Sequence, residues 1–245
     1  MEICCLPAGV SDFPLEDRCH LFFRIMKLFM YFTGQFPDLS LLIPQNGPKT
    51  ELHVVGYVTW SYLLFIFQNN LHPKQQKVLQ SLLEIESHLF ASKSESILYF
   101  LIMMGGLPNN PKHAFLVDLS HFYPLATNVK KTETVIFREL FESLMKIPFF
   151  DNLFECFEPT RTYLYICASK DFSSTWFLPR LQFRLPRICP VYVVKVVPDV
   201  SQSFAESEVT ESSLTHQELH RVLYELPSEL RWYASPLVLN GVKPC

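Results

Sequence analysis

The chain has 245 residues, enough for one large domain, and we expect residues 1–245 to form a single one. Hydrophobic residues make up 49% of it and charged residues 18%, which predicts an ordered core and excludes wholesale disorder. A formal net charge of −3 without a basic stripe argues against nucleic acid as a partner. The adjacent glycines Gly105 and Gly106 carry neither Gly-rich phosphate-loop pattern, so nucleotide binding by such a loop is not expected.

The seven cysteines are odd in number and scattered, and none belongs to a Cys-x-x-Cys motif. Residues 1–10 have neither a basic start nor a long apolar run, so no signal peptide is predicted. We therefore expect reduced thiols in the cytosol or nucleus.

Three segments show the three- and four-residue spacing of apolar side chains that is typical of amphipathic helices. The first covers about Leu15–Phe36, with Gly34 and Pro37 as stop signals. The second covers 73–90, with proline in its first turn, and the third covers about Thr132–Lys146. Their apolar stripes are Leu21, Phe22, Ile25, Met26, Leu28, Phe29 and Phe32; Val78, Leu82, Ile85 and Leu89; and Ile136, Phe137, Leu140, Phe141, Leu144 and Met145.

The uncharged segment Val54–Phe67 raises the question of a membrane. Its length falls short of the roughly 20 residues that a spanning helix requires. Gly56, Thr59 and Ser61 also interrupt it. We expect a buried strand or a short core helix here, and no membrane as a partner.

Strand signals lie between and after the helices. Ile97–Met104 is continuously apolar, which predicts a strand buried on both faces. A Gly- and Pro-rich turn separates it from Ala114–Leu119, so the two segments are expected to form an antiparallel hairpin. Further strands are predicted at Thr162–Ala168, Arg180–Leu185, Tyr192–Val197 and Arg231–Leu239.

Proline at position 236 indicates that the last of these is an edge strand or ends there. Asp199–Thr215 contains four acidic residues and no Lys or Arg, which predicts a solvated, mobile loop. The order of the elements favours an α+β fold, with helices packed on one face of a mainly antiparallel sheet.

No catalytic site is predicted. His216 and His220 are four residues apart on one predicted helix face, a spacing that can hold zinc. Gln217 stands where a metalloprotease has its glutamate, and no third ligand has an obvious spacing, so a surface helix face is the preferred interpretation. A Gly-x-Ser-x-Gly nucleophile motif is also absent from the sequence. We expect no bound metal and no cofactor.

Aromatic residues beside an arginine form the most unusual run in the chain. Trp176-Phe177-Leu178-Pro179-Arg180 combines the residue types that dominate binding hot spots, although Trp176 and Phe177 could equally anchor a strand in the core. Trp232-Tyr233 poses the same question. On the third helix, Phe137 and Phe141 lie one turn apart, and periodicity alone places both in the core.

Several of these segments, in this order, resemble a known family of mitotic checkpoint silencers. The matching segments are Cys19 to Tyr31, the Gln75-Gln76 helix stripe, Ile97 to Gly106, Val117-Asp118-Leu119-Ser120, Leu140-Phe141, Trp176 to Pro186, and Trp232-Tyr233-x-x-Pro236. They cover roughly three quarters of the chain and are similar to the comet family of Mad-two-binding proteins.

The resemblance implies a HORMA-like fold of three helices on an antiparallel sheet, with a C-terminal safety-belt segment at its edge. It also implies a non-enzymatic adaptor without a cofactor. Such an adaptor binds the closed form of Mad-two and presents it to a hexameric AAA+ ATPase, which opens it. The mitotic checkpoint complex is thereby disassembled. The implied location is the nucleus and cytoplasm, and the spindle or kinetochore in mitosis.

The resemblance also assigns residues to two surfaces. Phe141, with Phe137 and Phe32, is expected to contact Mad-two. Phe32 stands where the family has a glutamine, so a hydrogen-bonding amide is replaced by apolar area. Pro179 and Arg180 match a Pro-Lys pair that engages the ATPase, and arginine keeps the charge but not the shape of lysine.

Three other functions remain open from the sequence. The chain could be a HORMA protein that closes its C-terminal segment, Arg231–Cys245, round a peptide. It could be a metal hydrolase that uses His216 and His220. It could also associate with membranes through Val54–Phe67.

Overall fold

The structure is a computed structural model that describes residues 2–8, 18–37, 72–92, 96–120, 133–146, 158–185, 189–198, 217 and 219–242. For 2–8, 133–137 and 197–198 it describes the backbone without the side chains. The predictions for Val54–Phe67 and Asp199–Thr215 lie outside these residues. No helix within the described ranges has the length and apolar character needed to cross a membrane.

The three predicted helices are confirmed as α1 (Arg18–Phe32), α3 (Pro73–Phe90) and α4 (Glu133–Met145). Helix α1 ends just before Gly34, whose φ of 62° lies in the left-handed region that favours glycine. Helix α3 begins with proline in the first turn, and His72 caps it by accepting a hydrogen bond from the Lys74 amide. These start and stop signals set the ends of both helices.

Within the described ranges, seven strands form one mixed sheet: β1 (Glu2–Ala8), β2 (Ile97–Met104), β3 (His113–Asp118), β4 (Arg161–Ser169), β5 (Leu178–Arg180), β6 (Val191–Pro198) and β7 (Leu230–Asn240). Their spatial order is β1-β6-β3-β2-β4-β7-β5. The β2–β3 hairpin is antiparallel as predicted, and so are the pairs β2–β4, β4–β7 and β5–β7. Strand β6 pairs in parallel with β1 and β3, so the sheet is mostly, not wholly, antiparallel.

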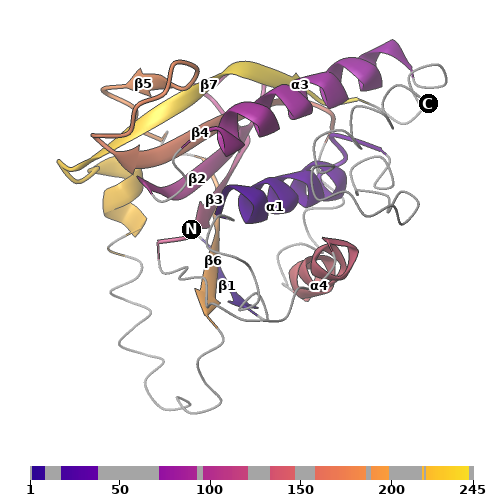
Figure 1. The fold of residues 1–245 in the computed structure, drawn as a ribbon, viewed down its shortest axis with the longest axis horizontal. Helices are drawn as coiled ribbons and strands as arrows, with labels where there is room; N and C mark the ends of the chain where they lie inside the picture. The colour runs from indigo at the N-terminus through magenta and orange to yellow at the C-terminus, as the bar shows by residue number, and fades with distance from the viewer. Residues whose placement is uncertain are drawn as a thin grey trace.

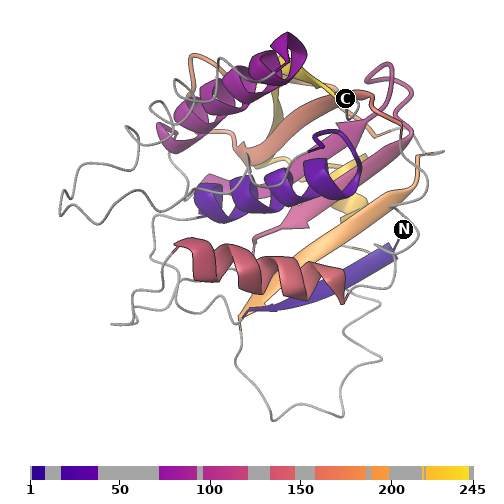
Figure 2. The same ribbon diagram turned by 90° about the vertical axis from the view of Figure 1, so that its right-hand side faces the viewer.

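Helices α1, α3 and α4 lie on one face of this sheet (Figures 1 and 2), which agrees with the predicted α+β arrangement. Helix α4 lies toward the β1 edge, and β5 lies at the opposite edge (Figure 1). The described part of the fold therefore has two well-separated ends.

The structure adds one strand to those predicted and corrects two of the predictions. Strand β1 was not predicted, because β6, its partner among the described strands, is almost two hundred residues away in sequence. The strand expected at Arg180–Leu185 is instead β5, which ends where that segment begins. Strand β7 is not an edge strand along its whole length, because β5 pairs with its residues 232–234. Pro236 lies beyond that pairing and within a register shift against β4, where its missing N–H is tolerated.

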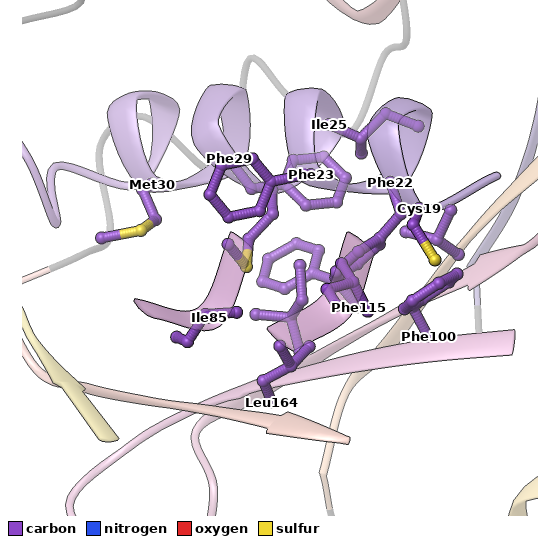
Figure 3. Packing of buried hydrophobic residues seen from close by; sticks show 14 of the residues in the cluster. Cys19, Phe22, Phe23, Ile25, Phe29, Met30, Ile85, Phe100, Phe115 and Leu164 are labelled. Carbon is purple, nitrogen blue, oxygen red and sulfur yellow. The ribbon is translucent and has the colours of Figure 1, made fainter. Parts of the chain in front are cut away.

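The larger core lies between the helices and the sheet. Figure 3 shows aromatic side chains of α1 pointing toward those of the strands. The ring centroids of Phe22 and Phe100 are 3.8 Å apart, and those of Phe29 and Phe115 are 5.0 Å apart. Each fully buried side chain of this size contributes about 1.5–3 kcal/mol through burial. This packing fixes α1 on the sheet.

A second core covers the opposite face of the sheet. Leu101 and Met103 of β2 belong to it, whereas Phe100 and Ile102 belong to the helix-side core. The continuously apolar sequence of β2 is explained by this double burial. A helical segment at 219–224 closes the second core, where the indole nitrogen of Trp232 donates a hydrogen bond to the carbonyl of Val222 (3.3 Å).

Candidate protein-binding surfaces

The first candidate surface lies on α4. Leu140 and Leu144 anchor the helix in the core, and Phe141 is half-buried between them in sequence. Its ring lies 5.2 Å from the ring of Phe32 on α1, at an interplanar angle of 40°. Phe141 therefore packs against the core and still offers apolar surface to solvent.

Met145 extends this surface by one helical turn. The periodicity placed it in the buried stripe, but its side chain is 39% exposed at the end of α4. Residues four apart lie on the same side of a helix, so Met145 and Phe141 form one apolar area, which we call the α4 patch. An ion pair between Arg138 and Glu142, with Nε and Oε1 3.8 Å apart, lies on the exposed side of the same helix.

Phe32, which the resemblance assigns to the Mad-two contact, lies in the core. It is 3% exposed, so its ring cannot meet a partner directly in this conformation and instead supports Phe141 from below. A phenylalanine here belongs to the core, whereas a glutamine would need a hydrogen-bond partner. The side chain of Phe137 lies outside the described part of the chain.

The second candidate surface is the sheet edge at β5. Trp176 and Phe177 pack in the helix-side core, whereas Phe183 and Leu185 pack in the core on the other face. Residues 176–185 therefore wrap round the edge of the sheet. We call the exposed middle of this segment, 178–182, the rim. Leu178 is 49% exposed and Leu181 is 77% exposed, and Pro179 and Arg180 lie between them, also exposed.

Two grooves flank the rim. One, of about 580 Å³, runs between the rim and the β2–β3 turn and is lined by Pro108, Asn109, Tyr165, Phe183 and Arg184 together with rim residues. The other, of about 980 Å³, runs between the rim and residues 224–226. The described residues that line the first groove include two arginines and no acidic residue. Burial raises the pKa of Tyr165 there, and the charge of Arg180 opposes that shift.

Among the described residues, no three side chains of His, Cys, Asp or Glu gather into a possible metal site. His220 lies near the ring of Tyr224, with centroids 4.7 Å apart, and His216 is outside the described ranges. Cys19, Cys167 and Cys189 are buried. Burial raises the pKa of the Cys189 thiol to about 11, so this thiol is poorly suited to act as a nucleophile.

Comparison with known proteins identifies the family. A family profile described as "p31comet: Mad1 and Cdc20-bound-Mad2 binding" matches residues 5–204. The chain belongs to the p31comet family. The resemblance seen in the sequence is therefore confirmed, and so, for the family, is the expectation of a binding protein rather than an enzyme.

A mouse (Mus musculus) relative, MAD2L1-binding protein, is 26% identical over 183 residues. The match covers 74% of this chain and 63% of the mouse protein, so the chain spans somewhat under two thirds of the length of that relative. The matched profile includes α4, with Phe141, and the rim. Both candidate surfaces therefore belong to the part of the chain that carries the family relationship.

Proposed function

We propose that this protein is an adaptor that binds the closed form of Mad-two and presents it to a hexameric AAA+ ATPase for opening. Membership of a family described by Mad1 and Cdc20-bound-Mad2 binding supports the client. The α4 patch is the observation that carries the proposal, because a half-buried aromatic on a rigid helix is a common form of binding hot spot.

The rim is the proposed contact with the ATPase. Arg180 is exposed and forms no ion pair with the described residues, so its charge is available to a partner. Exposed Leu178 and Leu181 add apolar area on both sides of it. The rim and the α4 patch lie at opposite ends of the described fold (Figure 1), so the two partners can bind at the same time.

We further propose that the fold is HORMA-like and that the segment beginning with β7 corresponds to the safety belt. Three helices on one face of a mostly antiparallel sheet are consistent with that assignment. The adaptor itself hydrolyses no ATP in this scheme, since the remodelling energy comes from its partner. Disassembly of the mitotic checkpoint complex is the expected outcome.

The two surfaces can be separated by one experiment with purified proteins. Phe141→Ala should weaken capture of closed Mad-two by at least about 30-fold, the size of a 2 kcal/mol hot spot. Arg180→Glu should leave capture unchanged and block ATPase-driven opening. Unchanged capture by Phe141→Ala would remove the α4 patch from the proposal, and normal opening with Arg180→Glu would remove the rim.

Two further variants control for folding and for general stickiness. Met145→Glu adds a charge to the α4 patch without hollowing the core, so it should also prevent capture while the melting temperature stays near that of the wild type. Leu107→Ala removes another exposed apolar side chain, 61% exposed, which lies in the turn between β2 and β3 and not on α4, and it should capture Mad-two normally.

A further inference from the structure

We infer that the stacked pair of His88 and Trp176 is a positioning device that holds the rim in the geometry required by the ATPase. The inference rests on the proposed function of the rim and adds two residues that lie outside both the rim and the α4 patch. The reason to seek such a device is the construction of β5, which has three residues, all of them exposed. No core side chain of its own fixes the direction of this strand.

The residues just before β5 supply that anchoring. The hydroxyl oxygen of Ser174 accepts hydrogen bonds from the amides of Trp176 (3.2 Å) and Phe177 (3.0 Å), which fixes the turn into the strand. Phe177 is 1% exposed and lies edge-on to Trp176, with ring centroids 4.8 Å apart. The direction of β5 therefore depends on where these two rings are held.

Helix α3 holds the outer ring. The imidazole of His88 stacks on the indole of Trp176, with centroids 4.6 Å apart and planes 15° from parallel. His88 lies in the last turns of α3, next to Leu89, which is fully buried. Helix α3 is in turn tied to α1 by an ion pair between Lys27 and Glu86, with Nζ and Oε1 3.8 Å apart. Through this stack the rim is connected to the rigid helical layer.

Trp176 and Phe177 have different structural roles. Phe177 is buried, so its removal would leave a cavity and destabilise the whole protein. Trp176 is half-buried at the surface, and the imidazole of His88 on α3 stacks on its ring. Its removal should release the rim at a small cost to global stability. This contrast separates a positioning role from a purely structural one.

The first test uses the purified chain alone and measures amide hydrogen exchange at Leu178 and Arg180, because Pro179 between them has no amide hydrogen. Trp176→Ala and His88→Ala should each speed exchange at these amides by about 2- to 10-fold, the effect of one aromatic stacking contact. His88→Phe keeps a stacking ring and should restore wild-type exchange. Unchanged exchange with Trp176→Ala would overturn the inference.

The second test measures opening of closed Mad-two by the ATPase as the adaptor concentration is varied. Trp176→Ala should raise the adaptor concentration for half-maximal rate by about 2- to 10-fold, with the maximal rate and Mad-two capture unchanged. His88→Phe should behave as the wild type. If Trp176→Ala opens Mad-two normally while Arg180→Glu blocks opening, the inference about the stacked pair is overturned and the proposed role of the rim stands. Normal opening with both would overturn the proposed role of the rim as well.

Discussion

Gln35 is fully buried, and its polar atoms join three separate parts of the chain. Its Oε1 accepts a hydrogen bond from the Thr160 amide (2.7 Å), and its Nε2 donates to the carbonyls of Thr33 (2.8 Å) and Glu158 (3.3 Å). Its own backbone carbonyl accepts from the amide of Val242 (2.9 Å). The side chain of this one residue thus joins the end of α1 to the entry to β4, and its backbone carbonyl binds the residues after β7.

Gly241 is required by this arrangement. A Cβ at this position would lie 2.9 Å from the Thr160 amide nitrogen and closer still to Gln35 Oε1. We predict that Gly241→Ala lowers the free energy of unfolding by about 1–3 kcal/mol, as overpacking does elsewhere. Urea denaturation measures the change. Gly106→Ala is the matched control, because nothing lies within 4 Å of the added Cβ, and an equal loss there would contradict the explanation.

Helix α3 contacts the segment that leads into the rim through His88. The first turn of this helix is capped by His72. His72 Nδ1 accepts from the amide of Lys74 (3.3 Å), and Gln75 Oε1 accepts from the amide of His72 (3.2 Å). Histidine is not among the residues that usually cap helices. The sequence pattern nevertheless located the helix, because Pro73 and the apolar stripe carry the main signal.

Replacement of His72 should lower the free energy of unfolding when the new residue cannot cap the helix, and restore or raise it when the new residue caps well. His72→Ala removes the acceptor and should cost about 0.5–1 kcal/mol of the free energy of unfolding, whereas His72→Asp should recover or exceed the wild-type value. Thermal and urea unfolding both report the change. Lys77→Ala, an exposed substitution one turn further along α3, should have little effect. Identical behaviour of His72→Ala and His72→Asp would show that the cap contributes nothing.

At the scale of the whole molecule, the buried cysteine thiols should make the free energy of unfolding decrease at alkaline pH. Burial raises the pKa of Cys189 from 9.0 to about 11 and also raises that of Cys167. Below the usual value both the folded and the unfolded chain keep the proton, so stability is unaffected. Between the ordinary pKa of the thiol and its pKa in the folded chain, the thiol ionises in the unfolded chain but not in the folded one. The free energy of unfolding should therefore fall as pH rises through about 9 to 11.

Urea denaturation across that pH range tests this prediction. The free energy of unfolding should decline steadily toward pH 11, and Cys189→Ala should show a shallower decline. A Cys189→Ala variant with the same slope as the wild type would mean that other groups carry the effect.

The helices and central strands could be predicted because their signals are local. Apolar spacing located α1, α3 and α4, and the double burial of β2 follows from its uninterrupted apolar sequence. Strand β1 could not be found, since it depends on a distant parallel partner. A strand was predicted at Arg180–Leu185, but the side chains of Phe183 and Leu185 anchor this segment to the second core while its backbone leaves the sheet.

The candidate surfaces were only partly visible in the sequence. Phe141 and Arg180 came from the resemblance, because periodicity alone placed Phe141 in the core. The exposure of Met145 and the burial of Phe32 depend on how α4 lies on α1, which no spacing of residues in one segment can report. The stack of His88 on Trp176 joins residues far apart in sequence and required the assembled fold.

The shortness of β5 has a mechanical consequence. A pulling force applied at this border of the sheet would first strain the few backbone bonds that tie three residues to β7. Strand β7 is bonded to β4 along nearly its full length, so the load needed to separate that inner pair is greater. Under such a force β5 should separate from β7 before β7 separates from β4, and both cores should stay intact.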